Sequence, residues 1–197
     1  MTLPDLKIHT PAESWPEQGQ WTFEDWLRLP DDGFRYELIQ GELLMSPPPS
    51  IEHQNAVSSL LAEMRLFARK HYLGLVLTSP VGVRSPQWKG VLQPDILFVS
   101  SERADIVQKD YIEDAPDLVV EILSPSNWMI DRGRKQEAYR QAGVREYWIV
   151  DYRAQTVDVL VLEGGDYMQH GHYGVGDMAL SEVLIGFSIP VAEVFAH

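Results

Sequence analysis

The chain has 197 residues, of which 45% are hydrophobic and six are tryptophan, so it can bury the core of one folded domain. It has no cysteine, which excludes a disulfide framework and a thiolate zinc site and fits a cytoplasmic protein. The net charge of −13 and the isoelectric point of about 4.8 argue against tight, salt-resistant nucleic-acid binding by one chain, although a local basic patch can outweigh the sum. We find no signal peptide and no apolar run of membrane-spanning length, so we expect no membrane partner.

The N-terminal third predicts an arm, a short helix and a hairpin. Residues 1–20 are rich in proline and polar residues and predict an extended arm, which leaves residues 21–197 as a single domain. Thr22 and Asp25 have the spacing of a capping box at the start of a helix that Pro30 ends. Residues 34–45 alternate as a hairpin with its turn at Gln40 and Gly41.

The rest of the chain alternates between helical and strand patterns. Residues 51–71 carry apolar side chains at three- and four-residue spacing, which predicts a helix with one buried face. Strands are expected over residues 73–83, 91–99 and 117–123. A second helix follows over residues 131–142 and is closed by Gly143.

The last part of the chain is rich in strand patterns. Two strands are expected over residues 146–150 and 156–162, and a short β-rich flap follows them. This order of elements predicts an α/β fold, a mixed sheet flanked by helices on both faces.

Two carboxylates lie within the apolar runs. Asp95 belongs to the run 91–99 and Glu121 to the run 117–123. A buried carboxylate is costly unless a cation meets it, and two carboxylates on neighbouring strands repel each other. A divalent ion held between them resolves both problems. The alternative is that each carboxylate pairs with an arginine or caps the end of a strand.

The second predicted helix adds a lysine to this pair. Asp131, Lys135 and Tyr139 are four residues apart and share one helical face, directly after the strand with Glu121. At that end of the sheet Lys135 can neutralise charge on a phosphate or orient a hydrolytic water. The alternative is a partly exposed lysine that pairs with Asp131 and contributes little to stability.

Several segments in this order resemble the PD-(D/E)XK restriction-endonuclease superfamily. More narrowly, the chain is similar to a large bacterial family of restriction-endonuclease-like proteins, formerly a domain of unknown function. The matching segments are YELIQGE (residues 36–42), EHQ (52–54), QPD (93–95), APDLVVEILSPS (115–126), Asp131 with Lys135 and Tyr139, and AGVREYWIVD (142–151). The superfamily places a lysine two residues after the second acid, where this chain has Leu123, so Lys135 on the following helix becomes the candidate.

The resemblance implies a magnesium-dependent phosphodiesterase on a restriction-endonuclease-like fold. Asp95 and Glu121 would bind Mg²⁺ or Mn²⁺ with the main-chain carbonyl of Ile122, and Lys135 would stabilise developing charge. Such oxygen ligands suit a hard cation rather than zinc.

Four other residues have open roles. Glu42 would lie near the site and bind metal or act as a base, or it is an exposed hairpin carboxylate. His53 would contact a carboxylate or the scissile phosphate, or it is structural. The sheet face of Glu37 is open, and Tyr139 is expected to orient Lys135.

The function that follows is a metal-dependent endonuclease acting on nucleic acid, with DNA as the expected partner. A homodimer is expected because cutting a duplex needs two sites, and the aromatic segment around Trp21, Phe23 and Trp26 is a candidate contact or a cover for the core. The alternatives are a non-catalytic protein that binds nucleic acid or self-associates on the same fold, and a magnesium hydrolase acting on a nucleotide.

Overall fold

The computed structural model describes residues 15–124 and 131–196. Most of the predicted N-terminal arm, residues 1–14, lies outside the described residues. From Trp15 onward the chain packs on the first hairpin. Trp15 stacks on Trp21 with 5.4 Å between ring centroids, and the main-chain N–H groups of Gly19 and Trp21 donate to the carbonyl of Gly41.

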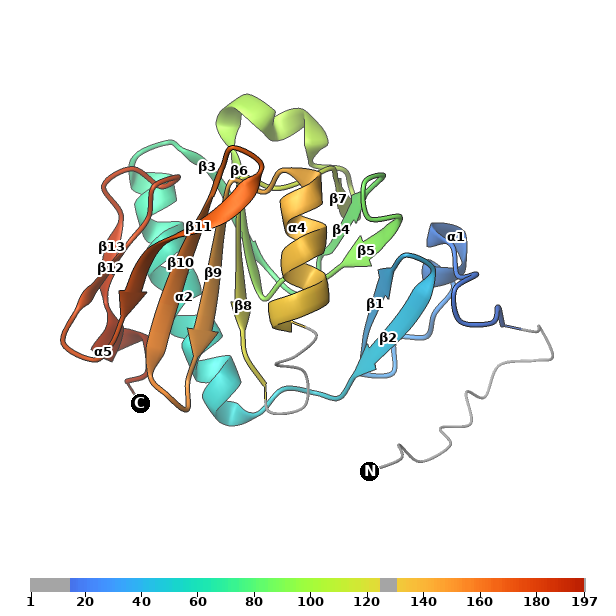
Figure 1. Cartoon of the computed structure of the whole chain (residues 1–197), viewed down its shortest axis with the longest axis horizontal. Helices are drawn as coiled ribbons and strands as arrows, with labels where there is room; N and C mark the ends of the chain where they lie inside the picture. The colour runs from blue at the N-terminus through green and yellow to red at the C-terminus, as the bar shows by residue number, and fades with distance from the viewer. Residues whose placement is uncertain (1–14, 125–130, 197) are drawn as a thin grey trace.

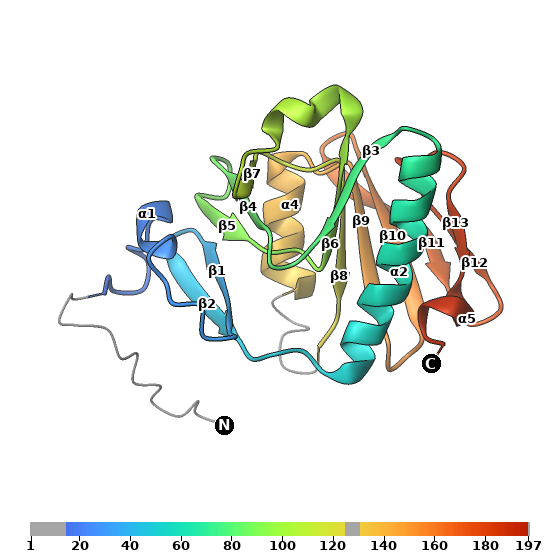
Figure 2. The same cartoon turned by 180° about the vertical axis from the view of Figure 1, so that it is seen from behind.

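A six-stranded mixed sheet forms the centre of the molecule, in the order β11-β10-β9-β8-β6-β3 (Figures 1 and 2). All neighbouring pairs are antiparallel except β8 and β9, which run parallel. The strands are β3 (Gly74–Thr78), β6 (Ile96–Ser100), β8 (Leu118–Ile122), β9 (Glu146–Asp151), β10 (Thr156–Glu163) and β11 (Asp166–Tyr173).

A second, five-stranded sheet has the order β2-β1-β5-β4-β7. It also contains one parallel pair, β4 with β7. Its strands are β1 (Arg35–Ile39), β2 (Glu42–Ser46), β4 (Gly82–Ser85), β5 (Gly90–Leu92) and β7 (Tyr111–Glu113). The prediction of a mixed sheet with helices is therefore confirmed, whereas the expectation of one sheet was wrong.

Helices cover both faces of the six-stranded sheet. Figure 1 shows α4 beside β8, between the two sheets, and Figure 2 shows α2 on the opposite side of the six-stranded sheet. The helices are α1 (Phe23–Trp26), α2 (Ile51–Lys70), the 3₁₀ segment η1 (Ser101–Ile106), the π-helical turn η2 (Asp131–Lys135), α4 (Gln136–Ala142) and α5 (Val191–Val194). None of the helices in the described ranges is long and apolar enough to cross a membrane.

The alternation of side chains along β8 creates two separate cores. Leu118, Val120 and Ile122 pack against α2, the hairpin of β12 (Met178–Leu180) and β13 (Ser188–Pro190), and α5. Val119 and Leu123 point the other way, toward α4 and the five-stranded sheet. Glu121 lies between Val119 and Leu123 on this second face, so the carboxylate enters the space between the two sheets.

Two predicted strands are each divided at a proline. The expected strand over residues 73–83 is two strands, β3 and β4, with Pro80 between them, and they belong to different sheets. The expected strand over residues 91–99 becomes β5 and β6, with Pro94 between them. Proline has no N–H to continue a ladder, so the chain changes sheets at each point. Asp95 consequently precedes β6 rather than lying inside a continuous strand.

The structure confirms the predicted helix cap and the predicted hairpin turn. Thr22 and Asp25 form the predicted capping box of α1. Gln40 and Gly41 have φ of 51° and 80° and connect β1 to β2, as a two-residue hairpin turn requires. The predicted second helix is α-helical only from Gln136 and ends at Gly143 in the left-handed conformation.

Candidate active site

The sheet register places Asp95 beside Glu121. Ile96 lies opposite Val120 in the antiparallel pair of β6 and β8, so extending the register by one residue brings Asp95 opposite Glu121. Each residue is only 1% exposed. The two carboxylates therefore meet on one face of the sheet, at the end where β6 begins and β8 finishes.

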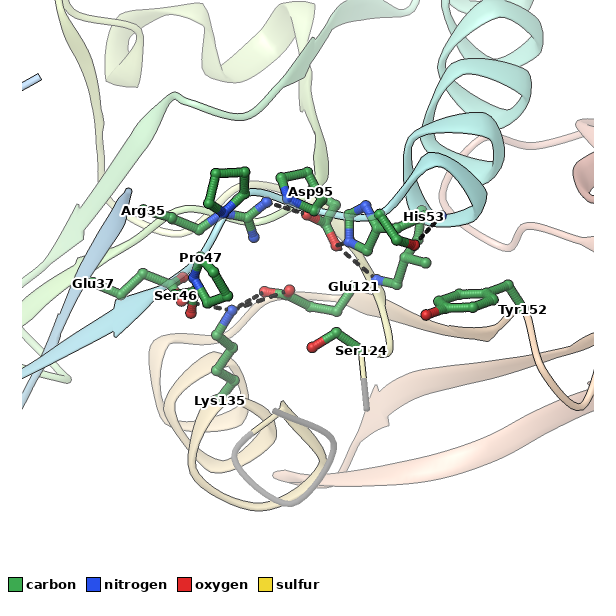
Figure 3. Close-up of a pocket in the computed structure, with 14 residues that line it drawn as sticks. Arg35, Glu37, Ser46, Pro47, His53, Asp95, Glu121, Ser124, Lys135 and Tyr152 are labelled. Carbon is green, nitrogen blue, oxygen red and sulfur yellow. Dashed lines mark hydrogen bonds and ion pairs between the residues drawn. The ribbon is translucent and has the colours of Figure 1, made fainter. Parts of the chain in front are cut away.

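Three donors hold the carboxylate of Asp95. Nη2 of Arg35 lies 2.6 Å from Oδ1, while Nε2 of His53 and the main-chain N–H of Ile122 lie 3.1 and 2.8 Å from Oδ2 (Figure 3). Burial opposes ionisation, but the hydrogen bond from His53 and the charge of Arg35 outweigh it and hold the pKa of Asp95 well below its usual value. Asp95 is therefore a fixed anion.

Lys135 and Tyr139 hold the carboxylate of Glu121. Nζ of Lys135 is 3.1 Å from both Glu121 oxygens, and the Tyr139 hydroxyl donates to Oε1 at 2.6 Å. Burial and the charge of Glu121 raise the pKa of Tyr139 well above its usual value, so its hydroxyl remains a donor. Lys135 is 3% exposed, which excludes the alternative of a partly exposed lysine.

Glu37 is a third buried acid at the site, and the sequence had left its sheet face open. Its Oε2 lies 2.9 Å from Nζ of Lys135, and its Oε1 accepts the main-chain N–H of Gln93 at 2.8 Å. Lys135 thus lies between Glu37 on one sheet and Glu121 on the other (Figure 3). The available signal was the same as for Asp95 and Glu121: an acid within an apolar strand.

These side chains line a cavity of about 260 Å³ between the two sheets. Arg35, which the sequence reading also missed, lies on one side of it, and Tyr152 lies on the opposite side (Figure 3). The lining residues are Arg35, Glu37, Ser46, Pro47, Pro48, Pro49, Ser50, His53, Asp95, Glu121, Ile122, Ser124, Lys135 and Tyr152. The predicted site residues Asp95, Glu121, Ile122, Lys135 and His53 belong to this set. Glu42 does not, and neither does Tyr139, whose hydroxyl orients Glu121 rather than Lys135.

Glu42 does not line the cavity. It lies at the start of β2, and its Oε2 pairs with Nη1 of Arg134 at 2.8 Å, with both side chains about half exposed. Glu42 stands opposite Ile39 at the turn end of the hairpin, whereas Glu37 stands opposite Leu44, so Glu42 is displaced along the hairpin from Glu37. The position of Glu42 matches the alternative of an exposed hairpin carboxylate.

The chemistry of the oxygen atoms at this site fits a hard divalent cation. Among the described residues, no group of three or more His, Cys, Asp or Glu side chains is arranged to hold a metal ion. A main-chain carbonyl can complete a set of two carboxylates. Continuing the register of β6 and β8 sets Ile122 opposite Pro94, which has no N–H to donate to the Ile122 carbonyl. Ile122 also lines the cavity beside Asp95 and Glu121, so its carbonyl is a candidate third oxygen ligand.

Comparison with protein families gives a match over residues 23–192, which spans every element of the site, to the family described as "Uma2: Putative restriction endonuclease". The chain belongs to this family. The resemblance noted from the QPD and EILSPS segments is confirmed, and membership of Uma2 supports a nuclease. No curated protein matches the chain.

A solved structure shares the Uma2 fold seen here. It is the crystal structure of "a putative nuclease belonging to DUF820 from Anabaena variabilis ATCC 29413". The TM-score is 0.74 at 18% identity, and the match covers 89% of this chain and 98% of that chain. The likeness confirms the mixed α/β architecture.

Proposed function

We propose that this protein is an endonuclease that hydrolyses phosphodiester bonds of DNA with Mg²⁺ or Mn²⁺. The observation that supports it best is the position of Lys135, a buried ammonium at the wall of a cavity that also contains the Asp95 and Glu121 carboxylates. A purely structural ion pair does not need to face a cavity, whereas a group that meets a phosphate does.

Asp95, Glu121 and the Ile122 carbonyl are the proposed metal ligands. When bound there, a divalent ion supplies Lewis-acid polarisation of the phosphoryl oxygen and an activated water. His53 and Arg35 keep Asp95 ionised, and together with the Ile122 N–H they fix the orientation of its carboxylate. The Tyr139 hydroxyl orients Glu121 and is 0% exposed, so it takes no part in the chemistry.

Lys135 is proposed to stabilise the charge that develops on the phosphate. In the absence of substrate it is held by Glu37 and Glu121. An arriving phosphate adds negative charge near the ammonium, and the interaction strengthens as charge grows on the equatorial oxygens. Glu37 is a positioning residue, since it contacts Lys135 and the main chain of Gln93.

His53 is proposed to hold Asp95 in the orientation that metal binding requires. Its Nε2 donates to Asp95, which leaves Nδ1 as an acceptor, and this buried Nδ1 has no hydrogen-bond partner among the described residues. The ring lies at the start of α2 and lines the cavity. The hydrogen bond from Nε2 therefore fixes the orientation of the Asp95 carboxylate beside the cavity.

The test is a nuclease assay on supercoiled DNA with Mg²⁺ or Mn²⁺, run beside Asp95→Ala. Wild type should nick or linearise the plasmid and Asp95→Ala should not. Tyr72→Ala, an 89% exposed residue outside the cavity, is the matched control and should cut as wild type does. Equal cutting by wild type and Asp95→Ala would indicate a contaminating nuclease.

Metal binding has its own measurement. Calorimetry should detect Mg²⁺ or Mn²⁺ binding to wild type and a weaker signal for Glu121→Ala, because a hard cation loses one of its oxygen ligands. Equal affinities would remove the metal from this site. If wild type cuts no nucleic acid with any divalent ion, the alternative of a non-catalytic nucleic-acid-binding protein on the same fold becomes the better conclusion.

A homodimer remains part of the proposal, because two-fold symmetry would supply two sites for two strands. Trp21, Phe23 and Trp26 pack within the chain against Leu38 and Val91, so these rings cover the core of the five-stranded sheet. Sedimentation at micromolar concentration should give a dimer. A monomer over the whole accessible concentration range would contradict this part.

A further inference from the structure

A second cavity, of about 420 Å³, adjoins the candidate active site. The two cavities share Arg35 and the three consecutive prolines 47–49 as lining residues. These prolines connect β2 to α2, and their fixed φ makes the shared wall stiff. A ligand whose phosphate lies at Arg35 can therefore extend into either cavity.

Aromatic rings line the second cavity, and their polar atoms are already satisfied. Trp26, Phe34 and Tyr36 contribute to its wall. Nε1 of Trp26 donates to the Tyr36 carbonyl at 2.7 Å, and the Tyr36 hydroxyl donates to Asp32 at 2.8 Å. Trp26 and Tyr36 are thus held in place by the chain itself. Aromatic side chains at the wall of a cavity are the groups on which a nucleobase stacks.

One buried polar atom at this cavity lacks a hydrogen-bond partner among the described residues. Gln93 is 7% exposed, and its Oε1 has no hydrogen-bond partner among the described residues. Its main chain is engaged on both sides, since its N–H donates to Glu37 and its carbonyl accepts from Arg35. A buried amide oxygen without a partner is unfavourable, and a glutamine amide carries the donor and acceptor that pair with the edge of a base.

Charge favours an unpaired strand over a duplex. The protein carries −13, and Asp31 also lines this cavity. Duplex DNA carries about one charge per 1.7 Å and a single strand about half that density, so an acidic protein meets less repulsion from a single strand. Stacking does not depend on salt bridges to phosphate, which suits a protein with few cations to offer.

We propose that the second cavity binds an unpaired nucleobase next to the scissile phosphodiester, so that the preferred substrate is single-stranded or locally unpaired nucleic acid. This rests on the proposed function for the position of the phosphate. The base stacks on the rings of the wall, and Gln93 bonds its edge. Arg35, which lines both cavities, contacts the phosphate between them.

The test measures binding separately from cutting. Fluorescence anisotropy with Ca²⁺ in place of Mg²⁺ compares a labelled single-stranded oligonucleotide, its duplex and an abasic strand of the same charge, with DNA and RNA versions of the single strand to identify the sugar. Wild type should bind the base-bearing single strand about tenfold more tightly than the abasic strand. The duplex should bind less tightly than the single strand.

Variants identify the cavity. Phe34→Leu keeps an apolar side chain without the ring and should weaken single-strand binding about tenfold, while Phe34→Tyr should restore it. Tyr72→Leu removes an exposed aromatic residue elsewhere and should change nothing. Circular dichroism confirms that each variant is folded.

The outcomes separate the two proposals. Equal binding of abasic and base-bearing strands, with no effect of Phe34→Leu, overturns the nucleobase cavity even if the protein cuts plasmid DNA. Base-dependent binding that Phe34→Leu weakens supports the cavity even if no cutting is found, and the nuclease proposal alone then fails.

Discussion

Glu121 and Glu146 are buried glutamates on the neighbouring parallel strands β8 and β9, yet their surroundings differ. Glu146 accepts the indole N–H of Trp148 and the main-chain N–H groups of Glu182 and Val183, and it is 0% exposed. It fastens the segment before β13 to the central sheet. Glu121 is held by the side chains of Lys135 and Tyr139 and faces a cavity.

The two glutamates differ in the groups that donate hydrogen bonds to their carboxylates. Main-chain and indole donors are fixed by the fold, so Glu146 has no freedom to exchange them for a ligand. A lysine ammonium can move toward a phosphate, and a carboxylate beside a cavity can accept a cation. Burial of an acid is therefore a weak sign of function by itself, while burial beside a cavity with a mobile cationic partner is a stronger one.

Exchanging Glu121 for glutamine should mainly reduce cleavage, whereas exchanging Glu146 for glutamine should mainly reduce stability. Glu121→Gln removes a metal ligand and should reduce DNA cleavage about a thousandfold, in line with losing a major electrostatic contribution at a transition state. Glu146→Gln turns an amide NH₂ toward main-chain N–H groups and should cost about 1–3 kcal/mol of unfolding free energy while cleavage by the folded fraction persists. Plasmid cleavage measures the activity of each variant and urea unfolding measures its stability. Equal losses of activity and stability in the two variants would contradict different roles for Glu121 and Glu146.

Lys135→Met should reduce cleavage about a hundredfold, by analogy with removing one oxyanion donor. Since Lys135 is buried between Glu37 and Glu121, its loss leaves two carboxylates without their cation and should cost about 3 kcal/mol near neutral pH. Thermal melting at neutral pH, beside single-turnover cleavage, measures both. Wild-type cleavage by this variant would make Lys135 purely structural.

The contributions of Asp95 and Glu146 to stability should depend on pH in opposite directions. The native pKa of Asp95 is below its ordinary value of 3.8, so its stabilisation is present above pH 3.8 and is lost as pH falls through the native pKa. Burial raises the pKa of Glu146 above 4.5 despite its donors, so its stabilisation is complete below pH 4.5 and is lost as pH rises through the native pKa.

Melting temperatures from about pH 3 to pH 7 test this contrast. The destabilisation caused by Asp95→Asn should grow as pH rises, whereas the destabilisation caused by Glu146→Gln should shrink. Parallel curves for the two variants would show that the two carboxyls titrate alike.

Glu42→Gln should have the smallest effect. Its pair with Arg134 is solvent-exposed, so the variant should lose less than about 0.5 kcal/mol of stability and cut DNA within about twofold of wild type. The same cleavage assay is sufficient. A large loss of activity would place Glu42 in the machinery and extend the site beyond the cavity described above.

Local signals were enough to predict much of this protein from sequence. The capping box at Thr22, the turn at Gln40 and Gly41 and the long amphipathic helix depend on interactions between residues close in sequence, so local sequence specifies them. Asp95 and Glu121 stood out because an acid in an apolar run conflicts with its surroundings.

Tertiary structure alone decided the rest. Whether the chain stays in one sheet or changes sheets at Pro80 and Pro94 depends on which strands pair, and pairing is non-local. Arg35 and Glu37 reach the site because β1 belongs to a second sheet that packs across α4 from the first, and Glu42, only five residues after Glu37, stays outside because the hairpin turns between them. Sequence could identify the buried acids, but only the packing of two sheets determined which of them share one cavity with Lys135.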